Sequence, residues 1–164
     1  MNLRIREGNI NDYEEIRELV KEVHLLHVKN RPDIYIDIEN PFEKEDFEEI
    51  LNSNNTKVFI AQDINNEEIV AYSIIQIMNT RNIPILVQSK FIYIDDLCVK
   101  AKHHKKGIGR TLFNYILNYS KEVKASSIQL NVWEFNEEAI KFYESLGMNT
   151  RNRRMEINLK NFIF

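Results

Sequence analysis

The stretch that decides the fold is FIYIDDLCVKAKHHKKGIGRTLFNYILNYSKEV, residues 91–123. Residues 90–99 predict an apolar strand, the basic middle predicts a turn, and the amphipathic remainder predicts a helix after Gly107. Only four glycines occur in the chain, and two of them, Gly107 and Gly109, stand in this turn. Such a turn can hold phosphate, because the first backbone N–H groups of a helix have no partners within the helix.

The composition indicates a single cytoplasmic domain. The 164 residues are 43% hydrophobic and 29% charged, as in an ordinary globular protein. The single cysteine excludes a disulfide within the chain and fits a reducing compartment. A net charge of −3 argues against a general nucleic-acid binder, although residues 100–110 are strongly basic. No run reaches the roughly 18 apolar residues of a membrane span, so we expect neither a nucleic-acid nor a membrane partner.

The flanking segments predict a mixed sheet that carries helices, an α/β (α+β) fold. Strands are expected over 3–6, 57–62, 68–78, 90–99 and 127–132, with a final extended segment over 149–159. Helices are expected from Asn11 or Asp12 as N-cap to about His27, over 42–51, after Gly107, and over 136–146. The helix after Gly107 joins two strands, and such a connection favours parallel neighbours.

Known phosphate motifs do not match the turn HKKGIGR, residues 104–110. A Walker loop requires G-x-x-x-x-G-K-[ST], which the turn lacks, and a dinucleotide G-x-G-x-x-G motif fails at Leu112. Consecutive amides of the turn could still wrap a diphosphate, with Lys105, Lys106 and Arg110 adding positive charge. The alternative is a tight, solvated basic turn without a ligand.

Two segments together resemble the GCN5-related N-acetyltransferase (GNAT) family. DLCVKAKHHKKGIGRTLFNYI resembles its acetyl-CoA motif, [QR]-x-x-G-x-[GA], and NVWEFNEEAIKFYESLGM resembles N-x-x-A-x-x-F-Y-x-x-x-G-[FM]. The resemblance implies one N-acetyltransferase domain over 1–164, with a central mixed twisted sheet of six or seven strands flanked by about four helices. The motifs are most similar to those of polyamine and small-amine acetyltransferases. His104 departs from the usual Gln or Arg, and the short tail after Gly147 leaves a seventh strand open.

Acetyl transfer to an amine needs a base, because only about one in a thousand lysine-like amines is neutral at pH 7. Asp95 and Asp96 are neighbours on a predicted strand, so we expect their side chains on opposite faces, with Asp95 beside Tyr93, Leu97 and Val99. The resemblance places Asp95 as the base and keeps Asp96 as the alternate. A purely structural pair of carboxylates is the competing interpretation.

The resemblance also implies a proton donor and a cofactor site. It places Tyr143 as the acid that protonates the leaving thiolate, whereas its apolar helix face also allows a packing role. The cofactor is expected to be acetyl-CoA, with a backbone N–H of Leu97 or Cys98 polarising the reacting carbonyl. Asn136 matches the family's cofactor-contacting asparagine, although helix capping equally explains it. The expected cofactor-binding residues are Leu97, Cys98, Val99, His104, Lys105, Lys106, Gly107, Ile108, Gly109, Arg110, Thr111, Asn136 and Tyr143.

The acceptor side is expected at the end of the first helix and in the connector after it. The residues proposed to line it are His24, His27, Arg31, Asp33 and Tyr35. Their competing interpretation is a polar helix end with a solvated connector. His24 and His27 share a helix face, but neither H-E-x-x-H nor a cysteine cluster accompanies them, so no metal is expected.

The sequence therefore predicts an acetyl-CoA-dependent N-acetyltransferase that acts on a small amine or a peptide amine by direct attack in a ternary complex. The alternative is a GNAT-like regulatory module that binds acetyl-CoA without turnover. A homodimer stays open, because exposed edge strands of this fold often pair. The sequence does not identify the amine.

Overall fold

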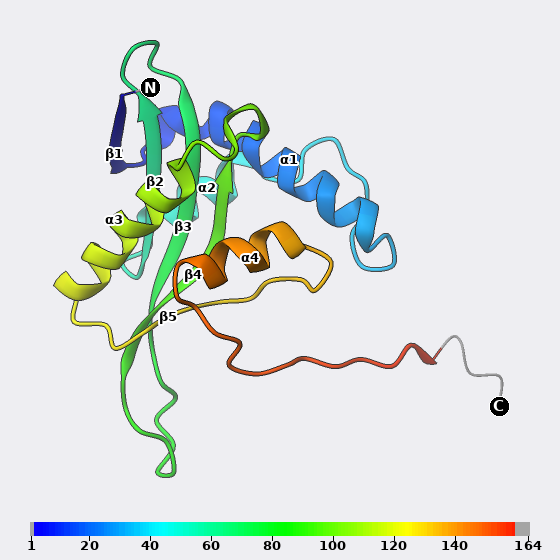
Figure 1. Cartoon of the computed structure of the whole chain (residues 1–164), viewed down its shortest axis with the longest axis vertical. Coiled ribbons are helices and arrows are strands. Elements are labelled where there is room, and N and C mark those ends of the chain that lie inside the picture. Colours follow the sequence, from blue (N-terminus) through cyan, green and yellow to red (C-terminus); the bar gives the residue numbers. More distant parts are fainter. Residues whose placement is uncertain (1, 160–164) are drawn as a thin grey trace. The chain divides into compact units, whose positions relative to one another are not determined.

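The structure is a computed structural model that describes residues 2–159. The chain divides into two compact units, Met1–Asn131 and Val132–Phe164. The described part of the first unit holds a five-stranded sheet with three α-helices and two short 3-10 turns, and that of the second holds one helix (Figure 1). No helix within residues 2–159 is long and apolar enough to cross a membrane.

The strands follow one another across the sheet in chain order. They are β1 (Leu3–Glu7), β2 (Thr56–Asp63), β3 (Ile69–Asn79), β4 (Lys90–Val99) and β5 (Ile128–Leu130). The pairs from β1 to β4 are antiparallel, whereas β4 and β5 are parallel. The parallel pair confirms the crossover expected through the helix after Gly107, which is α3 (Ile108–Glu122).

The two faces of the sheet carry different helices. Successive residues of a strand face opposite sides, so Val58 and Ile60 point to one side of β2 and Phe59 to the other. Val58 and Ile60 belong to a core with side chains of α1 (Tyr13–Asn30) and α2 (Lys44–Asn52), among them Leu19 and Phe47. Phe59 packs edge-on against Tyr115 and Tyr119 of α3. The sheet is therefore a middle layer, with α1 and α2 on one face and α3 on the other (Figure 1).

The expected α+β architecture with about four helices is confirmed, but the strand count differs. The described residues form five strands instead of six or seven, and 149–159, expected to be extended, contains no strand. Met155, Ile157 and Leu159 alternate there, yet they are 89%, 66% and 65% exposed. An alternating pattern becomes a strand only when a paired sheet buries its apolar face, and this pattern buries none.

Candidate active site

A β-bulge in β4 shapes the site. Ile74 lies opposite Asp96 and Ile75 lies opposite Ile94, so Asp95 is an extra residue without a partner on β3. A bulge interrupts the alternation of side chains, and two consecutive residues then face the same side. Asp96 accepts a hydrogen bond from the Tyr72 hydroxyl, on the face that carries α1.

Asp95 lies on that same face. It lines a pocket together with Gln76, which belongs to the same face of β3 as Tyr72. The expectation that Asp95 and Asp96 point to opposite faces was therefore wrong. Leu97 and Val99, expected beside Asp95, lie opposite Ser73 and Ala71 on the other face, because the bulge resets the alternation.

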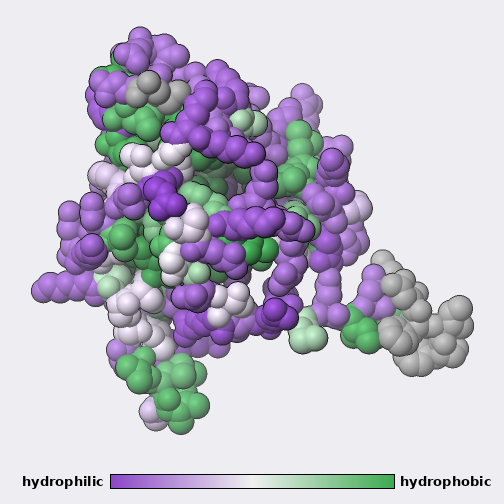
Figure 2. Space-filling view, viewed as in Figure 1, coloured by the Kyte–Doolittle hydropathy of each residue, from purple (hydrophilic) through white to green (hydrophobic). Residues whose placement is uncertain are grey.

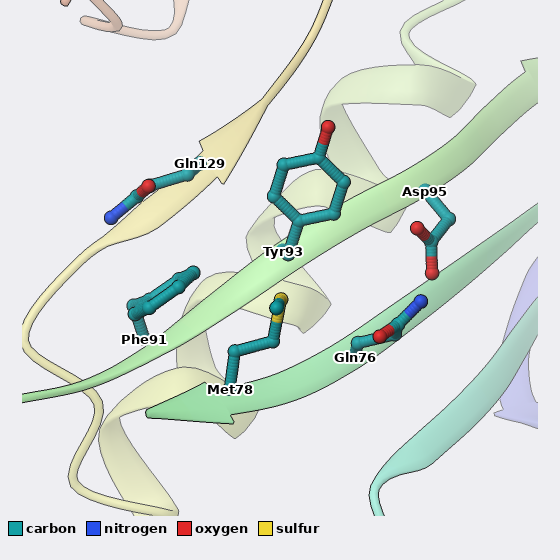
Figure 3. Close-up of a pocket in the computed structure, with 6 residues that line it drawn as sticks. All are labelled: Gln76, Met78, Phe91, Tyr93, Asp95 and Gln129. Carbon is teal, nitrogen blue, oxygen red and sulfur yellow. The ribbon is translucent and has the colours of Figure 1, made fainter. Parts of the chain in front are cut away.

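The pocket has a volume of about 280 Å³ and lies over three strands (Figure 3). Its walls are Gln76, Met78, Phe91, Tyr93, Asp95 and Gln129. Only Asp95 was among the predicted site residues. Phe91 and Tyr93 could have been found from the sequence, because every second residue of β4 shares the face of Asp95. The pocket residues of β3 and β5 could not, because their positions opposite β4 depend on the register of the strands. Register is set by pairing across the sheet, which local patterns do not give.

The two carboxylates have different surroundings. Burial raises the pKa of Asp95, and a hydrogen bond from the Gln76 amide partly offsets this. Burial raises the pKa of Asp96 to about 6, against lowering contributions from the Tyr72 hydroxyl and the Leu97 N–H. Tyr72 is fully buried, and the pKa of its hydroxyl is raised well above the ordinary value by burial and by the charge of Asp96. Both carboxylates thus hold a proton more readily than in water, as a general base for an amine requires.

The last residues of β4 have one unpaired edge among the described strands. β4 pairs with β5 only at residues 92–94, whereas its pairing with β3 continues to Val99. The Lys100 N–H donates to the Val70 carbonyl of β3 at 2.9 Å, so backbone groups at even positions of this segment point to β3. Leu97 and Val99 therefore turn their N–H and C=O groups away from β3. The side chain of Cys98 is buried against α1.

The turn after β4 begins with a 3-10 turn, Ala101–His103, and ends at the first residue of α3. Gly107 is the N-cap of α3 with φ +80°, a left-handed conformation that only glycine adopts without strain. Lys105 has φ +60°, which is uncommon for a residue with a side chain. Nε2 of His104 lies 2.7 Å from the Val99 carbonyl oxygen. The histidine that replaces the usual Gln or Arg thus ties the turn to the end of β4.

The basic cluster of this turn has two parts. Nζ of Lys100 and Nζ of Lys102 each lie 2.7 Å from Oε1 of Glu68, which precedes β3. These hydrogen bonds lower the pKa of Glu68 to about 2. Glu68 therefore anchors the beginning of the turn to the β2–β3 hairpin, while Lys105 and Lys106 come after this anchored part, next to Gly107.

The residues predicted for the acceptor side gather with each other instead of around the pocket. The rings of His27 and Tyr35 stack with centroids 4.9 Å apart, and Nε2 of His24 lies 2.9 Å from the Ile36 carbonyl oxygen. Arg31 makes a two-pronged ion pair with Asp33 at 2.9 and 2.8 Å. Burial, and the neighbouring His24, lower the pKa of His27. None of the five lines the pocket. The contacts of His24 and His27 join α1 to the connector, and the Arg31–Asp33 pair lies within the connector.

The second unit carries the other two motif residues. Asn136 is the N-cap of α4 (Glu137–Ser145), and its side chain accepts the Ala139 N–H at 3.2 Å. The capping interpretation of Asn136 is thus confirmed. Tyr143 lies on α4 with its ring 5.2 Å from that of Phe142. Within residues 2–159, no three His, Cys, Asp or Glu side chains gather as ligands for a metal ion.

The comparisons with known proteins identify the family of the chain. The family model of the Acetyltransferase (GNAT) family matches residues 16–148. A mutant of the BH1408 protein from Bacillus halodurans is 38% identical, with a TM-score of 0.92, and the match covers 95% of this chain and 99% of that one. The chain therefore belongs to the GNAT acetyltransferase family, whose members are N-acetyltransferases that use acetyl-CoA.

Two more distant structures share the fold. Glucosamine-6-phosphate N-acetyltransferase from Arabidopsis thaliana has a TM-score of 0.70 at 18% identity, over 96% of this chain and 99% of that one. AAC(6')-Iy, in complex with the bisubstrate analogue CoA-S-monomethyl-acetylneamine, has a TM-score of 0.74 at 15% identity, over 96% of this chain and 98% of that one. The enzyme class expected from the sequence, an acyltransferase, is confirmed by the family.

Proposed function

We propose that the chain transfers an acetyl group from acetyl-CoA to a primary amine by direct attack in a ternary complex. The observation that carries this proposal is the bulge of β4. It brings two carboxylates to the face that bears the pocket, and the open backbone edge of Leu97 and Val99 follows directly. The pocket for the acceptor amine, the carboxylate that would act as base and the backbone edge that would bind acetyl-CoA thus follow one another along β4.

The donor would lie along the end of β4 and the turn after it. An extended pantetheine arm can pair with an open strand edge through backbone N–H and C=O groups, and the Leu97 carbonyl and the Val99 N–H point to this edge, whereas the Val99 carbonyl contacts His104. The diphosphate would accept hydrogen bonds from the amides of residues 105–110 at the N-terminus of α3, where the helix dipole favours an anion; the Thr111 N–H donates to the Gly107 carbonyl. A backbone N–H of Leu97 or Cys98 would donate to the thioester oxygen; that of Leu97 points away from β3 and also donates to the Asp96 carboxylate, whereas that of Cys98 points toward β3.

The chemical step needs two proton transfers. Asp95 would take a proton from the ammonium group, directly or through water, and Asp96 is the alternate acceptor behind it. The free amine then attacks the thioester carbonyl, a C–N bond forms, and the C–S bond breaks. Tyr143 would give its proton to the departing thiolate. Its role rests on its place in the F-Y motif, and we propose that both units form one acetyltransferase domain, since the family match runs across Asn131.

The test has two stages. Calorimetry with acetyl-CoA and with CoA should show binding of both, and absence of binding would reject the proposal. Thiol release is then measured with spermidine, an aminoglycoside, amino acids and a peptide with a free N-terminus. Turnover with any of them supports the enzyme, whereas binding without turnover supports a regulatory module.

Tyr143→Phe tests the proton donor separately. We expect kcat to fall by about 10-fold or more, with unchanged acetyl-CoA affinity, because the ring remains and only the hydroxyl is lost. An unchanged kcat would reduce Tyr143 to a packing residue. Tyr115→Phe is the matched control, since this partly exposed tyrosine lies on α3 against Phe59.

A further inference from the structure

The walls of the pocket change in character from one end to the other. Gln76, Tyr93 and Gln129 are neighbours across β3, β4 and β5, so they form one row of polar groups. One step further along the strands, Met78 lies directly opposite Phe91. In Figure 3 Asp95 and Gln76 lie at one end, and Phe91 and Met78 lie away from the carboxylate. The pocket thus has a charged end at Asp95, and Phe91 and Met78 supply apolar surface away from it, on the side where Figure 3 also shows Gln129.

The charges of the walls restrict the ligand. Asp95 is the only one of the six lining residues that carries a formal charge, and none of the six is Lys, Arg or His. The next carboxylate, Asp96, is hydrogen-bonded to the buried Tyr72. One accessible carboxylate matches one cationic group. A phosphorylated sugar would find no cation in these walls, and a polyamine would bring a second ammonium group to a thioether and a phenyl ring.

The apolar surface adds a second requirement. Phe91 and Asp95 are four residues apart, about 13 Å along a strand. Met78 is 37% exposed and Phe91 is partly buried, so both have apolar surface left to cover. A methylene placed there leaves water for an apolar surface, which favours binding, whereas a charge placed there loses its hydration. The volume, about 280 Å³, is at the lower limit of the roughly 300–1,000 Å³ typical of small-molecule sites.

We infer that the acceptor is a small primary amine with one positive charge and an apolar body. Its ammonium group lies at Asp95 and its body extends over Tyr93 to Phe91 and Met78. This inference rests on the proposed function, because it identifies the substrate class of the same site. It predicts that aliphatic or arylalkyl monoamines are better ligands than polyamines, aminoglycosides and amino-sugar phosphates.

A matched pair of amines tests the inference by equilibrium binding. Hexylamine and 1,6-diaminohexane have the same length and differ only in the group at the far end. Titration calorimetry into the protein saturated with CoA avoids turnover. We expect hexylamine to bind at least about tenfold more tightly, because the second ammonium of the diamine must lose its hydration beside Phe91 and Met78. Equal or tighter binding of the diamine, or no binding of either amine, would overturn the inference.

A charge introduced at the apolar surface should reverse the preference. Met78→Glu places a second carboxylate opposite Phe91, so the diamine should then bind more tightly than hexylamine. Val87→Glu is the matched control, since Val87 is 87% exposed in the β3–β4 connection and the wild-type ratio should persist. Phe91→Gln should weaken hexylamine and leave the diamine nearly unchanged. Persistence of the wild-type ratio in both Met78→Glu and Phe91→Gln would contradict the inference.

Failure of the proposed function gives a different result. If no amine releases thiol from acetyl-CoA, the enzyme is rejected, but the ratio of the two binding constants still decides which amine the pocket prefers. If thiol is released and the diamine is preferred, the enzyme stands and the substrate class is wrong.

Discussion

The turn at residues 100–111 and the pocket over β3, β4 and β5 differ in how the sequence encodes them. The turn is local: its glycine, its basic residues and the helix after it are contiguous, and its conformation follows from them. The pocket joins residues from 76 to 129, and its carboxylates share a face only because β4 has one residue more than β3 at the bulge. The proposed donor site is therefore readable from a short motif, whereas the proposed acceptor pocket depends on pairing across the sheet. Figure 2 shows an apolar cluster over the β3–β4 connection and a mixture of polar and apolar side chains elsewhere, so surface hydropathy alone does not reveal the acceptor site.

The largest effect should come from Asp95→Asn, which acts on the pocket alone. We expect kcat/KM for the amine to fall by about 100-fold or more, because the variant cannot accept the amine proton. Acetyl-CoA affinity should stay within about twofold, since the turn keeps its amides. Steady-state kinetics and calorimetry measure the two quantities. Glu48→Gln, on the exposed side of α2, is the matched control. If Asp95→Asn also loses acetyl-CoA affinity, the pocket and the turn do not act independently.

The reciprocal change is Gly107→Ala in the turn. A residue with a side chain costs roughly 1–2 kcal/mol in a left-handed conformation, so acetyl-CoA should bind about 5- to 30-fold more weakly. The effect is conformational, because nothing lies within 4 Å of an added Cβ at Gly107.

Gly147→Ala is the control for that change. Gly147 has φ +89° and the same open surroundings after α4, so the substitution should cost similar stability without the loss of affinity. Equal losses of acetyl-CoA affinity in the two variants would show that general destabilisation, and not the turn, is measured.

A smaller effect distinguishes the two carboxylates of the bulge. The pKa of Asp96 is raised to about 6, so kcat/KM should fall as the pH drops through 6 if Asp96 is the base. The Tyr72 hydroxyl lowers this pKa, and Tyr72→Phe should therefore move the acid limb upward by about one pH unit. If the acid limb of the kcat/KM profile does not move in Tyr72→Phe, Asp95 is the base.

The stability of the protein provides a second measurement of Asp96. Its folded pKa lies above the unfolded value of about 3.9, so its contribution is full below that pH and is lost as the pH rises through about 6. In Asp96→Asn the free energy of unfolding should no longer fall as the pH rises through about 6. Compared with the wild type, the variant should gain thermal stability between pH 4 and pH 7, and an identical pH profile would contradict the assignment.

The sequence predicted most of the fold and the turn that we propose as the donor site. The turn, the parallel crossover through α3 and the cap at Asn136 were all readable, because each depends on residues close together in the chain. The faces of the Asp95 and Asp96 side chains could not be predicted, because strict alternation holds only in a strand without a bulge. The bulge of β4 becomes visible only when β4 is paired with β3. His24, His27 and Tyr35 are polar and aromatic, as binding residues often are, yet they contact each other and the connector. Their role in acceptor binding stays a prediction.

The smallest effect should come from Glu68→Gln, which tests whether the turn keeps its conformation without a contact from outside residues 100–111. Glu68 holds Lys100 and Lys102 from outside the turn, and its removal releases two cations near the proposed diphosphate site. Acetyl-CoA affinity should change by no more than about threefold, and the free energy of unfolding should fall by up to about 1 kcal/mol.

Because the pKa of Glu68 is lowered to about 2, the stabilisation is present above its ordinary pKa and is lost as the pH falls toward 2. The stability difference from the wild type should therefore be full at pH 7 and disappear in strong acid, whereas Glu67→Gln, next to it, should show none. A loss of affinity well beyond threefold would mean that the turn depends on the β2–β3 hairpin, and donor recognition would then be a property of the sheet as acceptor recognition is.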